Sequence, residues 1–168
     1  MKYFFKTKLG GIEFSESNRG VKSVKFFPRG KYSRKLSASA VKVRDFLNGR
    51  KVDLNGIPLD LGDTRFRVRV WSLTRRIPYG ETRTYGWLAG KLKSSPRAVG
   101  QALKKNPVPL IIPCHRVISS NGLGGFSCGV RLKRKLLEME GALKSAYSPK
   151  RGSMSYKHAK WLRQQTEV

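Results

Sequence analysis

Cys114 and His115 stand side by side in residues 113–117, and they are the pair in this chain best suited to covalent chemistry. A cysteine reacts as its thiolate, and a neighbouring histidine, cation or base raises the thiolate fraction at neutral pH. Two prolines and the apolar run 110–112 lead into the pair. The same position also suits an inert core thiol, and neighbours on a strand point to opposite faces. The two residues alone leave both interpretations open.

Other kinds of reactive site find less support in the sequence. The chain has two cysteines and two histidines, which give neither a disulfide framework nor four-ligand zinc spacing. The glycine-rich stretch 118–129 lacks the Lys-Ser/Thr pair of a phosphate-binding loop. We therefore expect no metal and no cofactor. Reduced cysteines fit a cytoplasmic protein, which would be nucleoid-associated in a prokaryote and nuclear in a eukaryote.

Positive charge is the strongest bulk property of the chain. Lys and Arg number 36 against 10 Asp and Glu, a formal net charge of +26, and Glu81 is the only acidic residue between Asp63 and Glu138. Such a chain should bind a polyanion, so nucleic acid is the expected partner and a generally basic surface is the alternative. We expect no membrane association, because no apolar run approaches the roughly 20 residues of a membrane span and no signal peptide begins the chain.

The elements that must position the Cys-His pair follow from apolar spacing and turn residues. Residues 2–7, 12–15 and 21–27 are expected strands, the first two joined by a turn at Gly10-Gly11. Apolar positions from Arg34 to Asn48 follow helical spacing. Residues 49–62 have few periodic positions and are expected to form a linker. We therefore place a domain boundary near residue 62.

Beyond the linker the pattern is helical. Three hydroxyl side chains occupy expected N-cap positions, Thr64, Thr84 and Ser95, and Pro96 suits the first turn that follows Ser95. The expected helices cover 64–76, a short stretch after 84, 97–105 and 130–141, the last with Leu132, Leu136 and Met139 inward.

The second and third of these helices have the plan of a helix-turn-helix. The helix at 97–105 combines Arg97 with the small residues Ala98, Gly100 and Ala102. Small side chains let a helix backbone approach DNA, and they equally let it pack on another helix. The sequence pattern alone does not choose between these.

Five motifs, in order and with near-family spacing over residues 64–141, resemble the O6-alkylguanine-DNA alkyltransferase family of self-methylating DNA repair proteins. They are Ile77-Pro78-Tyr79-Gly80-Glu81-Thr82 with Tyr85, Arg97-Ala98-Val99-Gly100, Asn106-Pro107-x-Pro109, Ile112-Pro113-Cys114-His115-Arg116-Val117 and Leu136-Leu137-x-x-Glu140-Gly141. The resemblance implies an α+β fold. Residues 1–62 would form a small ribonuclease-H-like sheet domain with a linker. Residues 63–144 would form a mainly helical DNA-binding and alkyl-acceptor domain with a winged-helix-like helix-turn-helix, and 145–168 a basic extension.

The resemblance also assigns the chemistry. Cys114 would attack the alkyl carbon on guanine O6, His115 would take the thiol proton through a water, and Glu140 would orient His115. Asn106 would tie the turn before the active-site segment as structural support. Because a thioether is not reversed, the protein would act once per molecule as a methylated-DNA–[protein]-cysteine S-methyltransferase. O4-alkylthymine is left open as a second substrate.

Access to a base inside double-stranded DNA requires base flipping. By the resemblance, Arg97 fills the gap left by the base and Tyr85 pushes the DNA backbone. Ala98 and Gly100 would let their helix enter the minor groove closely. The guanine pocket would be lined by Tyr85, Val117, Phe126, Ser127 and Pro109. The expected species is a monomer.

Departures from the family pattern concern the pocket. Phe126 stands where the family usually has Tyr, so the stacking face remains and the hydroxyl is lost. Cys128 replaces a small residue in the glycine-rich loop. The loop from Cys114 to the last helix is one residue shorter than in the family, and the interval from Tyr85 to Arg97 is two residues shorter.

Three rival functions make different predictions. A damage-sensing relative binds alkylated DNA without transfer, but such relatives replace the cysteine, so Cys114 argues against it. A helix-turn-helix transcription regulator would bind a specific sequence and keep its mass unchanged. A Cys-His hydrolase would turn over and would need an oxyanion site, which the sequence does not reveal.

Overall fold

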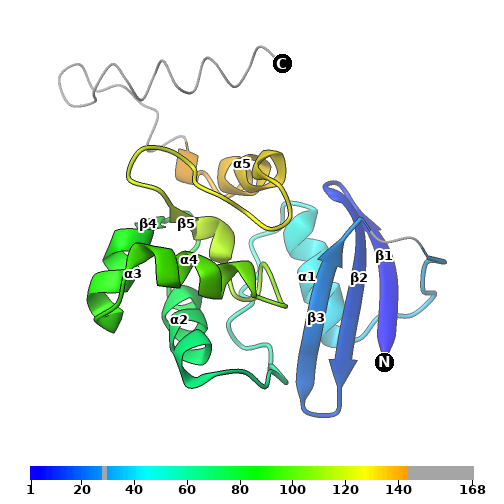
Figure 1. Ribbon diagram of the computed structural model, residues 1–168. Helices are drawn as coiled ribbons and strands as arrows, with labels where there is room; N and C mark the ends of the chain where they lie inside the picture. The colour runs from blue at the N-terminus through cyan, green and yellow to red at the C-terminus, as the bar shows by residue number, and fades with distance from the viewer. Residues whose placement is uncertain (28–29, 144–168) are drawn as a thin grey trace.

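The computed structural model describes residues 1–27 and 30–143, and it joins a small sheet to a group of helices (Figure 1). Strands β1 (Lys2–Thr7), β2 (Gly10–Ser17) and β3 (Gly20–Phe26) form an antiparallel sheet in the order β1-β2-β3. The turn between the first two strands was predicted wrongly, because it lies at residues 8–9 and Gly10 already pairs with Thr7. The Thr7 hydroxyl donates to the Gly10 carbonyl at 2.8 Å and accepts from the residue 9 amide, which closes the tighter turn.

Helix α1 (Ala38–Leu47) packs on the sheet. It begins later than the apolar spacing indicated, because Ser37 accepts a hydrogen bond from the Ala40 amide and caps it there. Its buried side is apolar and closes the core of this part of the chain, with the side chains Ala40, Val43, Phe46 and Leu47.

The three hydroxyl N-caps expected from the sequence are confirmed. They begin α2 (Arg65–Arg75), α3 (Tyr85–Leu92) and α4 (Pro96–Lys104), and each side chain accepts from the backbone amide three residues on. Helix α4 packs against both α2 and α3. The Trp71 indole of α2 donates to the Ala102 carbonyl of α4 at 3.0 Å, which fixes the two helices against each other.

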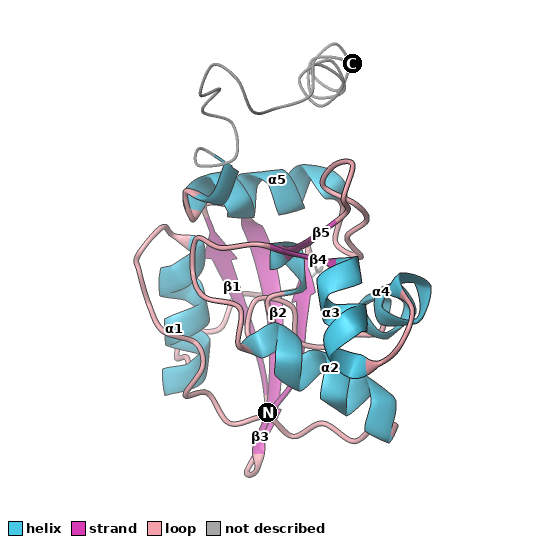
Figure 2. Ribbon diagram, turned by 90° about the vertical axis from the view of Figure 1, so that its left-hand side faces the viewer, coloured by secondary structure: helices cyan, strands magenta, loops and turns pink. Residues whose placement is uncertain are grey.

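The segment that carries the Cys-His pair lies between these helices and α5 (Val130–Met139). It forms a short 3-10 helix, η1 (Cys114–Arg116), and continues into β5 (Val117–Ile118), which pairs in parallel with β4 (Arg83–Thr84). Figure 2 shows α5 lying across the top of this pair. Just upstream, Leu110 holds a positive φ of 80°, a conformation that costs a branched residue about 1–3 kcal/mol and persists only where the surroundings enforce it.

The sheet and the helices are tied together rather than separated by a free linker. Among the described residues one apolar cluster runs from the sheet through α1 to α5. The Val24 amide of β3 donates to the Pro107 carbonyl at 2.9 Å, and the Arg75 guanidinium donates to carbonyls of residues 54, 55 and 57. The expected boundary near residue 62 stays a prediction, and the basic extension 145–168 lies outside the described residues.

In the described ranges, no helix has the length and apolar character to cross a membrane. The same ranges contain no group of three or more His, Cys, Asp or Glu side chains placed to hold a metal ion.

Candidate active site

The Cys114 thiol is almost fully buried at the start of η1 and is held by Asn106. The Asn106 amide nitrogen donates to Cys114 Sγ at 3.1 Å and to the Ile112 carbonyl at 2.9 Å, while its oxygen accepts from the Val108 amide at 3.0 Å. Asn106, predicted as structural support, therefore ties residues 106–112 into a turn and also contacts the sulfur. An N–H donor to sulfur favours the thiolate form.

Burial dominates the acidity of this thiol. Desolvation raises the pKa of Cys114 to about 11, against the smaller, opposite effect of the Asn106 hydrogen bond. The resting cysteine is therefore protonated at neutral pH. A reaction at sulfur requires a base close by.

His115 follows Cys114 in η1 and is paired with Glu140, which follows α5. His115 Nε2 and Glu140 Oε1 are 2.7 Å apart, and both side chains are fully buried. Because a carboxylate can only accept, Nε2 carries the proton in neutral His115 and Nδ1 keeps a free lone pair. Nδ1 is buried and has no hydrogen-bond partner among the described residues.

The protonation states follow from the same contacts. Burial alone would raise the pKa of Glu140, but hydrogen bonds and charge from His115 and Arg116 lower it to about 2. Burial lowers the pKa of His115 below its ordinary value, and the Glu140 hydrogen bond opposes this only in part. At neutral pH the pair is thus a carboxylate and a neutral imidazole, which is the state of a ready general base.

Arg116 and the 77–80 segment enclose the Glu140 carboxylate. Arg116 donates from Nε to Glu140 Oε2 at 2.9 Å and from Nη2 to Oε1 at 3.0 Å, a bidentate pair, and its Nη1 donates to the Ile77 carbonyl at 2.7 Å. The Gly80 amide donates to Glu140 Oε2 at 3.3 Å, and the Tyr79 hydroxyl donates to the Met139 carbonyl at 3.2 Å. The motif around Ile77 therefore holds the Glu140 carboxylate in place, directly through the Gly80 amide and indirectly through Arg116. Its sequence did not indicate this role.

Cys114 opens into a cavity of about 410 Å³ between α4 and the glycine-rich loop. Of the predicted site residues, Tyr85, Gly100, Phe126 and Ser127 line this cavity with Cys114. It is completed by Leu103, Lys104 and Gly125. The Phe126 ring meets His115 edge-on, with ring centres 6.4 Å apart.

Two predicted pocket residues lie elsewhere. Val117 is fully buried in β5, within the apolar core. Pro109 borders a neighbouring open groove, together with Ser127, Cys128 and residues of β3. Their contact with a bound base stays a prediction.

Tyr85 forms one wall of the cavity and depends on a glycine. Its hydroxyl donates to the Gly125 carbonyl at 3.2 Å. Gly124 has a φ of +68°, and a Cβ there would lie 2.9 Å from the Tyr85 ring. A side chain at position 124 would both strain the backbone and clash with the Tyr85 ring, so glycine is required there.

The comparisons with known proteins agree with this geometry. A family model described as the 6-O-methylguanine DNA methyltransferase DNA-binding domain matches residues 65–142. The methylated-DNA–protein-cysteine methyltransferase of Sulfolobus acidocaldarius is 43% identical over 141 residues, which cover 82% of this chain and 90% of that protein. The enzyme of the same name from Metallosphaera sedula is 51% identical over 102 residues, which are 61% of this chain and 65% of that protein.

Solved structures give the same result. The crystal structure of the Mycobacterium tuberculosis O6-methylguanine methyltransferase matches with a TM-score of 0.72 and 30% identity, over 84% of this chain and 94% of that one. The M. tuberculosis OGT in complex with DNA matches with a TM-score of 0.71 and 31% identity, over 83% of this chain and 91% of that one.

The chain belongs to the methylated-DNA–protein-cysteine methyltransferase family. Its mixed fold of a small sheet and helices is that of the solved family members. Arg97 and Ala98, two of the four residues expected to contact DNA, occupy the first turn of α4, where Arg97 is exposed. Gly100 lies one turn further on and reaches the Cys114 cavity.

Lys133 is a methyltransferase-site residue that the sequence analysis missed. Its side chain is fully buried, and Nζ donates to the Val117 carbonyl at 2.6 Å and to the Gly125 carbonyl at 3.0 Å. Burial lowers its pKa to about 8, while the nearby Cys114 acts in the opposite direction. The sequence did contain an indication that Lys133 is buried, because it falls three residues before Leu136 on the inward side of an amphipathic helix.

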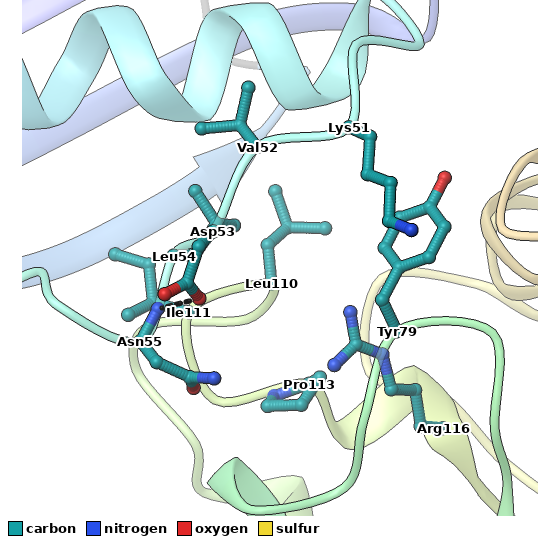
Figure 3. Close-up of a pocket in the computed structure, with 10 residues that line it drawn as sticks. All are labelled: Lys51, Val52, Asp53, Leu54, Asn55, Tyr79, Leu110, Ile111, Pro113 and Arg116. Carbon is teal, nitrogen blue, oxygen red and sulfur yellow. Dashed lines mark hydrogen bonds between the residues drawn. The ribbon is translucent and has the colours of Figure 1, made fainter.

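A second cavity, of about 340 Å³, lies behind the Cys-His turn (Figure 3). Pro113 and Arg116 reach it from the active-site segment, and Lys51, Asp53 and Asn55 reach it from the linker. The active-site turn of this family member therefore separates two cavities. Only the one on the α4 side exposes the thiol.

Proposed function

We propose that this protein repairs DNA directly, by moving the alkyl group of O6-alkylguanine onto Cys114 in a single, irreversible turnover. The observation that carries the assignment is the buried Cys114 thiol, which lines a cavity of about 410 Å³ and is followed in the chain by a neutral His115. Glu140 accepts from His115 Nε2, which leaves Nδ1 without a partner among the described residues and able to take a proton. No cofactor is required, because a thiolate is itself a soft nucleophile for an sp³ carbon.

The proton leaves first in the proposed mechanism. It passes from Cys114 Sγ through one water to His115 Nδ1, and the imidazolium is stabilised by the Glu140 carboxylate. Asn106 and the Lys133 ammonium stabilise the thiolate that remains. These two neighbours, a neutral hydrogen-bond donor and a cation, thus offset part of the desolvation that makes the resting thiol weakly acidic.

The alkyl transfer then balances without another reactant. The sulfur electron pair forms the S–C bond as the C–O6 bond breaks, and that bond pair stays on the guanine. Tyr85 donates a hydrogen bond to the departing guanine anion. The proton that His115 took from Cys114 then passes to that anion through water, so that guanine and the imidazole both end neutral. The products are guanine in DNA and a thioether at Cys114, which no second thiol in the cavity reverses.

The DNA geometry is also part of the proposal. The damaged base is flipped from the minor groove of double-stranded DNA into the Cys114 cavity, and Arg97 fills the gap.

The proposal extends to the organisation of the chain. The first 62 residues are a ribonuclease-H-like unit, and α3 and α4 belong to a winged-helix-like unit. The protein acts as a cytoplasmic monomer. O4-alkylthymine is a second substrate to be tested in the same cavity.

Repair stoichiometry tests the assignment. Duplex DNA with one O6-methylguanine is mixed with increasing protein, and restored guanine is measured after nuclease digestion and chromatography. The expected yield rises linearly to one guanine per protein molecule, is abolished in Cys114→Ser and is unchanged in Cys128→Ser. Multiple turnovers, or full repair by Cys114→Ser, would overturn the assignment.

Base flipping has its own test. Arg97→Ala should slow repair of duplex DNA far more than methyl transfer from free O6-methylguanine, because the free base needs no extrusion. An equal loss on both substrates would remove Arg97 from the flipping step.

A further inference from the structure

The outer side of α2 carries three arginines that the repair reaction does not use. Arg65, Arg69 and Arg76 are exposed and share one side of the helix, four and seven residues apart, with the 41% exposed Val68 between them. We call these three arginines the α2 arginine face.

This face lies on a different helix from the proposed DNA-binding side of α4. Helix α2 buries Val70, Trp71 and Thr74, which lie on the opposite side of the helix from the arginines, and Trp71 bonds to α4. Helix α4 in turn buries Val99, Ala102 and Leu103 and exposes Arg97 and Lys104. Because the two helices pack on each other through their buried sides, the arginine side of α2 and the Arg97 side of α4 both face away from the contact between the helices.

The charge of the α2 arginine face is not neutralised by the protein. None of its three arginines forms an ion pair with an acidic side chain in the described residues, and the single acid that pairs with α2 is Asp63, bound to Arg67. In contrast, Lys25 of β3 pairs with Glu13, and Arg19 in the turn between β2 and β3 pairs with Asp60. The α2 arginine face therefore keeps its full positive charge, and a polyanion is the partner that would neutralise it.

The placement of Arg65 in the first turn of α2 opposes helix stability. Helix α2 has no acidic residue in its first turn, where the helix dipole favours acids and disfavours the cations Arg65 and Arg67. Every cation of α2 and its C-cap is arginine, whereas β1 has only lysines. Arginine is the better ligand for phosphate oxygens, because its planar fork binds two of them at once.

We propose that the α2 arginine face is a second, sequence-independent binding surface for the phosphate backbone of duplex DNA. With α4 on one duplex and α2 on another, a single molecule bridges two DNA segments. Bridging needs no damaged base, so it is a function separate from alkyl transfer and does not depend on Cys114.

A bead assay tests the bridge with unmodified DNA. One duplex is fixed on beads, a fluorescent duplex of unrelated sequence is added with the full-length protein, and the captured fluorescence is measured. Capture should rise with protein, pass through a maximum, and fall when excess protein saturates both duplexes separately. Absence of capture by the wild-type protein would overturn the proposal.

Matched variants locate the surface. The triple variant Arg65→Gln, Arg69→Gln, Arg76→Gln should lose at least about tenfold of the capture, because three phosphate contacts are removed. Lys2→Gln, Lys6→Gln, Lys8→Gln removes the same charge from exposed positions on and beside β1 and should retain capture.

Two further readouts separate this function from repair. The α2 variant should keep the wild-type rate of methyl transfer and its affinity for a single duplex within about twofold. Equal loss of capture in both triple variants, retained capture in the α2 variant, or a large loss of single-duplex affinity would each overturn the second surface. Failure of methyl transfer in the wild-type protein with capture intact would instead count against the repair assignment alone.

Discussion

Replacing Glu140 by Gln removes one charge from the centre of the catalytic network while keeping the side-chain shape. The carboxylate accepts four hydrogen bonds, one from His115, two from Arg116 and one from the Gly80 amide. A glutamine offers one oxygen and one NH₂ group, so its NH₂ must face a donor. The variant therefore leaves the buried Arg116 cation without its counter-charge.

The expected cost has two parts. Breaking a buried ion pair from one side costs about 3–5 kcal/mol of folding free energy. The imidazolium formed when His115 takes the thiol proton also loses its stabilising partner, and the loss of such general-base catalysis slows a reaction by roughly 10²–10⁴-fold. We expect both effects in Glu140→Gln.

Single-turnover kinetics and urea unfolding measure the two parts separately. The matched control is Glu138→Gln, which removes the same charge from an exposed position on α5 and should change neither value. Adding Arg116→Met to Glu140→Gln removes the unpaired cation, so stability should recover while the rate stays low. A rate within threefold of wild type in folded Glu140→Gln would refute the proposed base.

The same carboxylate predicts an acid limit of stability. Folding lowers the pKa of Glu140 from 4.5 to about 2, so its contribution is complete above pH 4.5 and is lost as the pH falls towards 2. The contribution amounts to about 3 kcal/mol. Wild-type protein should lose that much more unfolding free energy across this range than the Glu140→Gln, Arg116→Met variant, and equal losses would contradict the linkage.

The remaining predictions concern His115 and the groups around the cavity. Because burial lowers the pKa of His115 from 6.5, the single-turnover rate should stay flat as the pH falls to 6.5 and decline only below it; a decline that begins above 6.5 would contradict a neutral base. Lys133→Met should slow methyl transfer roughly tenfold, since the ammonium charge that favours the Cys114 thiolate is lost, whereas exposed Lys135→Met should leave the rate unchanged. Gly124→Ala should lower the unfolding free energy by about 1 kcal/mol or more and displace Tyr85; unchanged stability and repair would show that the loop relaxes.

The parts of the fold that the sequence predicted are those decided locally. Thr64, Thr84 and Ser95 satisfy the amides of the turn that follows each of them, so their own neighbourhood places the start of each helix. The start of α1 was missed because apolar spacing continues upstream of Ser37, and only the cap shows where the backbone becomes helical. The first turn was misplaced for a similar reason, since Gly10 was assigned to the turn when its positive φ begins β2.

Only part of the catalytic network could be predicted from the sequence. The Cys114, His115 and Glu140 assignments came from the motif resemblance, but the roles of Arg116 and Lys133 depend on carbonyls and a carboxylate that are distant in sequence. A buried cation looks like a surface residue until tertiary structure supplies its acceptors. The motif around Ile77 could be recognised but not explained, because its partner lies some 60 residues downstream.

The position of the transferred methyl group is the most direct test of the central claim. The protein is incubated with duplex DNA that carries one O6-methylguanine, its intact mass is measured, and the modified peptide is sequenced by fragmentation. The account predicts one methyl group per molecule, located on Cys114, also in Cys128→Ser and absent in Cys114→Ser. An unchanged wild-type mass, or a methyl group on Cys128, would contradict it.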